Sequence, residues 1–152
     1  MEDVTKELLD EAIKIEKNMS KLYSLYEETF SDDARFWREL VKEEIEHAAL
    51  LEVAEAFEDI MPEALVHEQH LDEMRKTNKE IETTIEKYRK EQPSKEEAYQ
   101  FAYDCEEQAF ELHYQEVVTG SEESEATKRF KKLNADDKDH ALRIKELMDQ
   151  VL

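Results

Sequence analysis

Apolar residues recur along this chain at the three- and four-residue spacing of an amphipathic α-helix, in four long stretches. In the first stretch, about residues 3–30, the helical spacing is set by Leu9, Ala12, Met19, Tyr23, Tyr26 and Phe30. The other three stretches cover about residues 34–59, 95–118 and 122–151. This pattern predicts four helices that each bury one face in a shared core.

A fifth helical segment, about residues 63–91, has a narrower apolar seam among Lys, Glu and Arg residues, made of Leu71, Met74, Ile81, Ile85 and Tyr88. Such a seam is typical of a helix that lies on a bundle or pairs with another subunit. Ser94 and Glu97 form a capping box before the next helix, and Gly120 ends it. Four core helices with one long helical crossover between the second and third predict an all-α, ferritin-like four-helix bundle.

Composition supports one helical domain over residues 1–152, because the chain has 41% charged residues but only one glycine and two prolines. The formal net charge of -20 disfavours nucleic acid and anionic membrane surfaces as partners. No apolar run has membrane-spanning length, and the N-terminus does not resemble a signal peptide, which predicts a cytoplasmic protein. Cys105 is alone, so a disulfide framework and a rubredoxin-type iron site are excluded.

Two acidic residues interrupt the apolar faces of the predicted helices. Asp137 has apolar neighbours one and two turns away, which are Phe130, Leu133, Ala141, Ile144 and Met148. Glu44 is surrounded in the same way by Trp37, Leu40, Val41, Ala48 and Leu51. A histidine follows each acid after three residues and shares its helical face, His140 in one case and His47 in the other. One acid-x-x-His motif is common by chance, but two inside apolar stripes indicate a metal site far more specifically.

The other two core helices each carry one acid, Glu16 or Glu106, at the edge of the apolar stripe. Such acids are more often surface residues, so their assignment depends on their fit with the other four groups. Four carboxylates in one helical core are untenable without cations. Four acids and two imidazoles suit two iron ions, with manganese or zinc as alternatives. The predicted ligands are Glu16, Glu44, His47, Glu106, Asp137 and His140, with Glu107 as an alternative to Glu106.

Two further histidines, His67 and His70, lie on the polar fifth segment. Solvated surface residues are the expected interpretation for both, and a peripheral metal site is the alternative. Cys105 lies beside Glu106 on the buried side, where a small buried thiol is the expected state.

The four core helices, and more weakly the crossover, resemble the rubrerythrin branch of the ferritin-like superfamily. In the first helix, Ala12, Glu16 and Tyr23 resemble the family pattern Ala-x-x-x-Glu followed seven residues later by Tyr. In the second, Glu44 and His47 resemble its Glu-x-x-His segment. The second half of the chain is similar to a repeat of the first, which is also a family trait.

In that repeat, residues 102–106 are similar to residues 12–16, and Asp137 with His140 stands where the first half has Glu44 with His47. Three departures from the family pattern are visible. Asp137 replaces the usual Glu, His113 stands where the repeat would place a tyrosine, and the Cys-rich rubredoxin-like module is absent.

The resemblance implies a non-haem di-iron oxidoreductase that acts on peroxide or dioxygen, with electrons from an external donor such as a rubredoxin-like protein. Tyr23 would be a hydrogen-bond donor beside the metal ligands. We expect a homodimer. Two alternatives stay open: ferritin-like oxidation and storage of iron in a large shell, and a metal-free helical interaction module.

Overall fold

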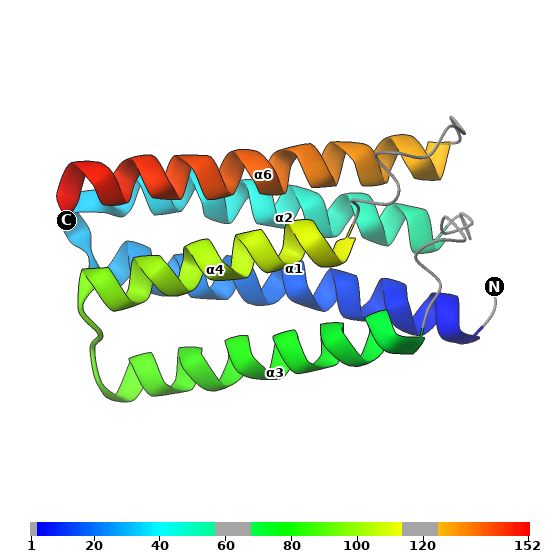
Figure 1. Ribbon diagram of the computed structural model, residues 1–152, viewed down its shortest axis with the longest axis horizontal. Helices are drawn as coiled ribbons and strands as arrows, with labels where there is room; N and C mark the ends of the chain where they lie inside the picture. The colour runs from blue at the N-terminus through cyan, green and yellow to red at the C-terminus, as the bar shows by residue number, and fades with distance from the viewer. Residues whose placement is uncertain (1–2, 57–67, 114–124) are drawn as a thin grey trace.

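The computed structural model describes residues 3–56, 68–113 and 125–152, and all regular structure in these ranges is helical (Figure 1). The helices are α1 (Asp3–Thr29), η1 (Ser31–Asp33), α2 (Ala34–Ala56), α3 (Glu68–Lys90), α4 (Lys95–His113) and α6 (Glu125–Val151). The all-α prediction is confirmed for these ranges. The predicted helical residues 57–59, 63–67, 114–118 and 122–124, and also Gly120, lie outside the described residues. None of the described helices is both long and apolar enough to cross a bilayer.

A short turn precedes α2, and a local sequence signal explains the start of α4. A single 3-10 turn, η1, takes the chain from α1 into α2 at the polar cluster that the sequence places between them. At the start of α4, the Ser94 hydroxyl oxygen accepts a hydrogen bond of 3.1 Å from the backbone N–H of Glu97. This bond is one half of the predicted capping box, and it satisfies a backbone donor that the helix itself leaves unpaired.

The helices lie side by side along one long axis (Figure 1). α1 and α2 run antiparallel and pack on each other, and α4 and α6 form a second antiparallel pair. α3 packs on α1 and runs in the same direction, so α4 begins at the end of the molecule where α2 also begins. α2 also contacts α6, and this contact brings the two pairs together.

The predicted seam of α3 is buried at every position named above and packs into the same core as α1. The seam also contains polar groups that the apolar pattern did not predict. Asn18 donates a hydrogen bond of 3.0 Å to the side-chain oxygen of Asn78, which itself donates to the Glu11 carboxylate at 2.7 Å. Because a buried polar pair is satisfied in only one alignment, it favours one register of α3 on α1.

Candidate metal centre

The six predicted ligands come from four helices and are all buried. α1 contributes Glu16, α4 contributes Glu106, and α2 and α6 each contribute an acid-x-x-His pair. None of the six residues exposes more than 3% of its surface. They form three overlapping groups in which each residue offers an atom within 4.8 Å of the others: Glu44–His47–His140, Glu16–His47–Asp137 and Glu106–Asp137–His140. These buried groups could hold metal ions.

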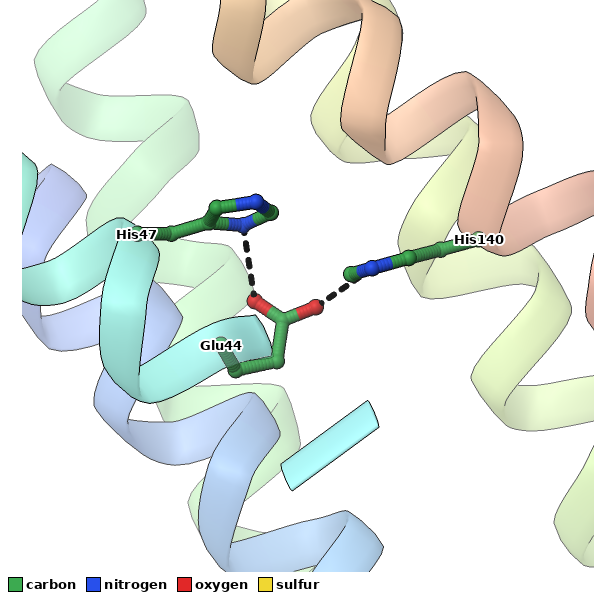
Figure 2. Close-up of side chains that lie close together, drawn as sticks. All are labelled: Glu44, His47 and His140. Carbon is green, nitrogen blue, oxygen red and sulfur yellow. Dashed lines mark ion pairs between the residues drawn. The ribbon is translucent and has the colours of Figure 1, made fainter. Parts of the chain in front are cut away.

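Glu44 lies between the two histidines (Figure 2). One carboxylate oxygen, Oε2, is 3.5 Å from His47 Nδ1, and the other, Oε1, is 2.8 Å from His140 Nδ1. The two imidazole rings are nearly parallel, with an interplanar angle of 22° and centroids 5.4 Å apart. One carboxylate from α2 therefore faces an imidazole of its own helix and an imidazole of α6 at once.

Each histidine also faces a second carboxylate from a neighbouring helix. His47 Nδ1 is 3.5 Å from Glu16 Oε2, and His140 Nδ1 is 3.4 Å from Glu106 Oε1. Each Nδ1 atom is thus shared between two acids, and both imidazoles direct the same ring nitrogen toward the acids. Ring nitrogens that converge with carboxylate oxygens are the atoms that would contact an ion in this cluster.

Several of these atoms lack a hydrogen bond within the described part of the chain. The two carboxylate oxygens of Glu44 are buried and make no hydrogen bond. The same is true of the Nδ1 atoms of His47 and His140, because the short contacts among these atoms are not aligned as hydrogen bonds. A buried polar atom that lacks a hydrogen bond costs about 1–3 kcal/mol unless a nearby opposite charge compensates it. The donor set fits a cation, since oxygen and imidazole ligands together suit iron, manganese or zinc.

Burial and mutual contact strongly shift the acid–base properties of the cluster. Burial, reinforced by the nearby charge of Glu44, raises the pKa of Glu16 to about 8. Burial alone would lower the pKa of His47, but the carboxylates of Glu16 and Glu44 raise it to about 11. His140 behaves in the same way, and its pKa rises to about 12 beside Glu106 and Glu44. Without a metal, protons therefore supply the positive charge that the acids require.

Tyr23 lies beside Glu106 and is placed to orient this predicted metal ligand. Its hydroxyl donates a hydrogen bond to Glu106 Oε1, and both side chains are buried. Burial and the Glu106 charge raise the pKa of Tyr23 well above its ordinary value, so the hydroxyl remains a donor. Glu107 is exposed, so the geometry favours Glu106 over this alternative.

Three other predictions concern one residue near the cluster and two residues of the predicted crossover. Cys105 is buried and free, as the sequence predicts. His70 lies on α3, but its side chain is not described, and His67 lies outside the described residues, so the surface assignment of both stays a prediction.

Asp136 is a member of the site that the sequence analysis missed. The second ring nitrogen of His47, Nε2, lies 3.0 Å from Asp136 Oδ2. Lys132 holds this carboxylate from one turn away on α6, with Nζ at 2.9 Å. Burial of Asp136 opposes its ionisation, but Lys132 and His47 overcome this effect and lower its pKa. An ionised acid behind an imidazole fixes the tautomer and orientation of the ring.

Glu43 occupies the matching position on the other side of the cluster. Its Oε1 atom is 3.7 Å from His140 Nε2, and both of its oxygens accept hydrogen bonds of 2.9–3.0 Å from Arg143. Each missed acid directly precedes a predicted ligand acid, Glu44 or Asp137. The doubled acids were therefore a visible signal: the second faces the cluster, and the first contacts the histidine of the opposite helix.

The helices and the cluster define a class, namely an all-α protein with buried carboxylate–imidazole groups that could hold metal ions. No family model, curated protein or solved structure matches this chain. Its function therefore has to be inferred from the side chains themselves.

Proposed function

We propose that this chain is a ferritin-like four-helix bundle of the rubrerythrin type that binds two divalent metal ions and carries out redox chemistry on peroxide or dioxygen. In this proposal α1, α2, α4 and α6 are the core helices, and α3 is the crossover between α2 and α4. The parallel directions of α2 and α4 support this connectivity, because a helix that returns along the bundle must separate them (Figure 1).

The observation that carries the proposal is the burial of four carboxylates and two imidazoles in one cluster. Burying one ionised carboxylate costs several kcal/mol unless positive charge is close by. Two divalent ions would balance four carboxylate charges and leave the imidazoles neutral, as metal ligands must be. A metal-free function gives no comparable reason for placing these groups in a helical core.

The chain's own residues have distinct roles in this proposal. Glu44 would hold ions through both of its carboxylate oxygens, because these oxygens face different histidines. Glu16 and Glu106 flank the two histidines, and Asp137 shares a group with each of these acids. A bound pair of iron ions would supply two electrons together to peroxide or dioxygen.

Surrounding residues would orient the ligands and keep bulk water away. Tyr23 fixes Glu106 by donating a hydrogen bond to one of its oxygens. Asp136 fixes the ring of His47, and Arg143 holds Glu43 beside His140. An external electron donor, such as a rubredoxin-like protein, completes the proposal.

Metal analysis tests the proposal directly. The protein is purified without chelator, its metal content is measured, and anomalous scattering from crystals locates the ions. We expect about two metal ions per chain inside the bundle, because carboxylates can bridge two ions while each histidine binds one. The double variant Asp137→Ala, His140→Ala should lose both ions.

The matched control is Asp104→Asn, which neutralises an exposed acid on α4 and should keep the metal content of the unaltered chain. Circular dichroism verifies that each variant is helical. A helical protein that binds no iron, manganese or zinc, even when these are added in excess, would refute the metal site. Turnover of peroxide by the loaded protein with a chemical reductant then tests the redox function separately.

A further inference from the structure

A continuous set of aromatic rings leads away from the candidate metal centre. The ring of Tyr23, whose hydroxyl contacts Glu106, is 5.2 Å from Trp37 between centroids. Trp37 is in turn 4.9 Å from Tyr99. All three rings are fully buried, and they come from α1, α2 and α4. Tyrosine and tryptophan are the side chains most easily oxidised by one electron, and rings in contact exchange electrons rapidly.

The far end of this set has a built-in proton acceptor. The Tyr99 hydroxyl donates a hydrogen bond of 2.5 Å to Asp33 Oδ2, and Lys95 Nζ lies 3.0 Å from the same oxygen. The Asp33 side chain is 10% exposed and that of Lys95 is 30% exposed, so the ring set ends one side chain from solvent. Burial, together with the hydrogen bond to Asp33, raises the pKa of Tyr99, so its oxidation requires an acceptor for the phenolic proton.

We propose that Trp37 and Tyr99 form an electron relay between Tyr23, at the candidate metal centre, and Asp33, in η1 at one end of the bundle. Through this relay a small one-electron reductant in solution, such as a thiolate or an ascorbate-like enediolate, supplies electrons to the buried site. The physiological use of the relay rests on the proposed redox function, but electron transfer through it can be measured without metal.

Each transfer moves one electron and one proton. When the oxidant of the proposed function, peroxide or dioxygen at the candidate metal centre, draws one electron from Trp37 by way of Tyr23, the indole radical cation that remains takes an electron from Tyr99. The Tyr99 hydroxyl passes its proton to the Asp33 carboxylate, which leaves a neutral tyrosyl radical and a protonated acid. The reductant then gives one electron to the tyrosyl radical and becomes a one-electron-oxidised radical itself. Asp33 returns the proton, so the phenol and the carboxylate are restored.

The relay is distinguishable from ordinary aromatic packing because Trp37 has a second tyrosine neighbour with a different partner. The ring of Tyr26 is 5.0 Å from Trp37, close to the Tyr99 distance. Its hydroxyl, however, donates to the backbone carbonyl oxygen of Ala98 at 2.7 Å, and a carbonyl is too weak a base to take the proton. Tyr26→Phe is therefore a matched control for Tyr99→Phe.

Laser photo-oxidation of the metal-free protein tests the relay, because Trp37 is the only tryptophan in the chain. Light that tryptophan absorbs and tyrosine does not creates the indole radical at this one position. Transient absorption then follows the loss of that radical and the growth of the tyrosyl radical. A Tyr23→Phe background removes the competing phenol on the inner side of Trp37.

In that background, Tyr99→Phe and Asp33→Asn should each lengthen the indole-radical lifetime about tenfold and reduce the tyrosyl yield. Asp33→Glu, which restores a carboxylate, should recover part of the rate of electron transfer from Tyr99 to Trp37. Deuterium oxide should slow this electron transfer in the Tyr23→Phe chain. Tyr26→Phe should leave both quantities unchanged. Circular dichroism establishes that every variant is folded.

The relay is refuted if Tyr99→Phe and Asp33→Asn leave the lifetime and the yield unchanged in folded protein. It is also refuted if Tyr26→Phe alters them by the same factor, since a phenol without a carboxylate partner would then donate the electron as well as Tyr99 does. Neither result depends on metal binding. A chain that transfers the electron as expected but binds no metal would refute the proposed function and leave the relay established.

Discussion

Metal binding to the cluster should release about three protons per chain at neutral pH. In the metal-free protein the pKa values of His47 and His140 are about 11 and about 12, and that of Glu16 is about 8. At pH 7 each of these three groups therefore carries about one proton. A metal ligand has to be an unprotonated imidazole or carboxylate, so all three protons must leave when ions bind.

The same pKa values determine how pH changes the stability of the metal-free protein. Both histidine pKa values are raised, so their contribution is fully present below about pH 6.5 and is lost as pH rises through the folded-state values. The raised pKa of Glu16 acts in the same direction between its ordinary value of 4.5 and about 8. The metal-loaded protein has the opposite dependence, because ions replace the protons. The difference in Tm between the two forms should therefore widen from about pH 6 to about pH 8.

Isothermal titration calorimetry with manganese(II), in buffers of different ionisation enthalpy, measures the proton count without redox chemistry. Glu16→Gln should lower the release from about three protons to about two, because one proton-bearing group is removed. Asp104→Asn, an exposed acid on the same bundle, should leave it at about three. A release below about one proton in the unaltered chain would mean that the histidines are neutral without metal, and the electrostatic argument would be wrong.

Three further outcomes follow from single contacts. Asp136→Asn should weaken metal binding about 10–100-fold, because His47 loses an ionised partner. Competition with a chromogenic chelator measures the metal affinity, and an unchanged affinity would show that Asp136 does not support His47 as a ligand. Asn78→Ala should lower the free energy of unfolding by about 1–3 kcal/mol, because the Asn18 amide loses one of its two acceptors in the α1–α3 seam and keeps only the Glu82 carboxylate. Ser94→Ala should cost about 1 kcal/mol through the lost cap of α4. Urea denaturation measures both losses, and a loss of zero for either would contradict its contact.

The convergence of the acids could be predicted because it depends on helical periodicity alone. Asp137 and Glu44 stand where an apolar residue would be expected on each helix, and the structure buries both. Glu16 and Glu106 were weaker cases at the stripe edges, yet they are equally buried. An acid on the inner face of one helix needs polar or charged partners from other helices. An acid at an apolar position of one helix therefore implied acids or histidines on the inner faces of the others.

Contacts that cross between helices were harder to predict. Asp136 follows the polar face of α6 by periodicity, and only the relative placement of α2 and α6 reveals its approach to His47. Asn18 and Asn78 are likewise polar residues whose burial depends on how α3 seats on α1. Periodicity identifies the face of a single helix, but register between helices is a property of the pair.

The cluster also joins two parts of the chain, neither of which contains a complete site. The α1–α2 pair supplies Glu16, Glu44 and His47, and the α4–α6 pair supplies Glu106, Asp137 and His140. The contact of 2.8 Å between Glu44 Oε1 and His140 Nδ1 joins the two pairs. Removing both protons and metal would leave ionised acids of both pairs facing one another, so the pairs would repel. The free energy of binding cations is therefore also free energy that holds the pairs together, and in the metal-free protein their interface is the part that weakens first as pH rises.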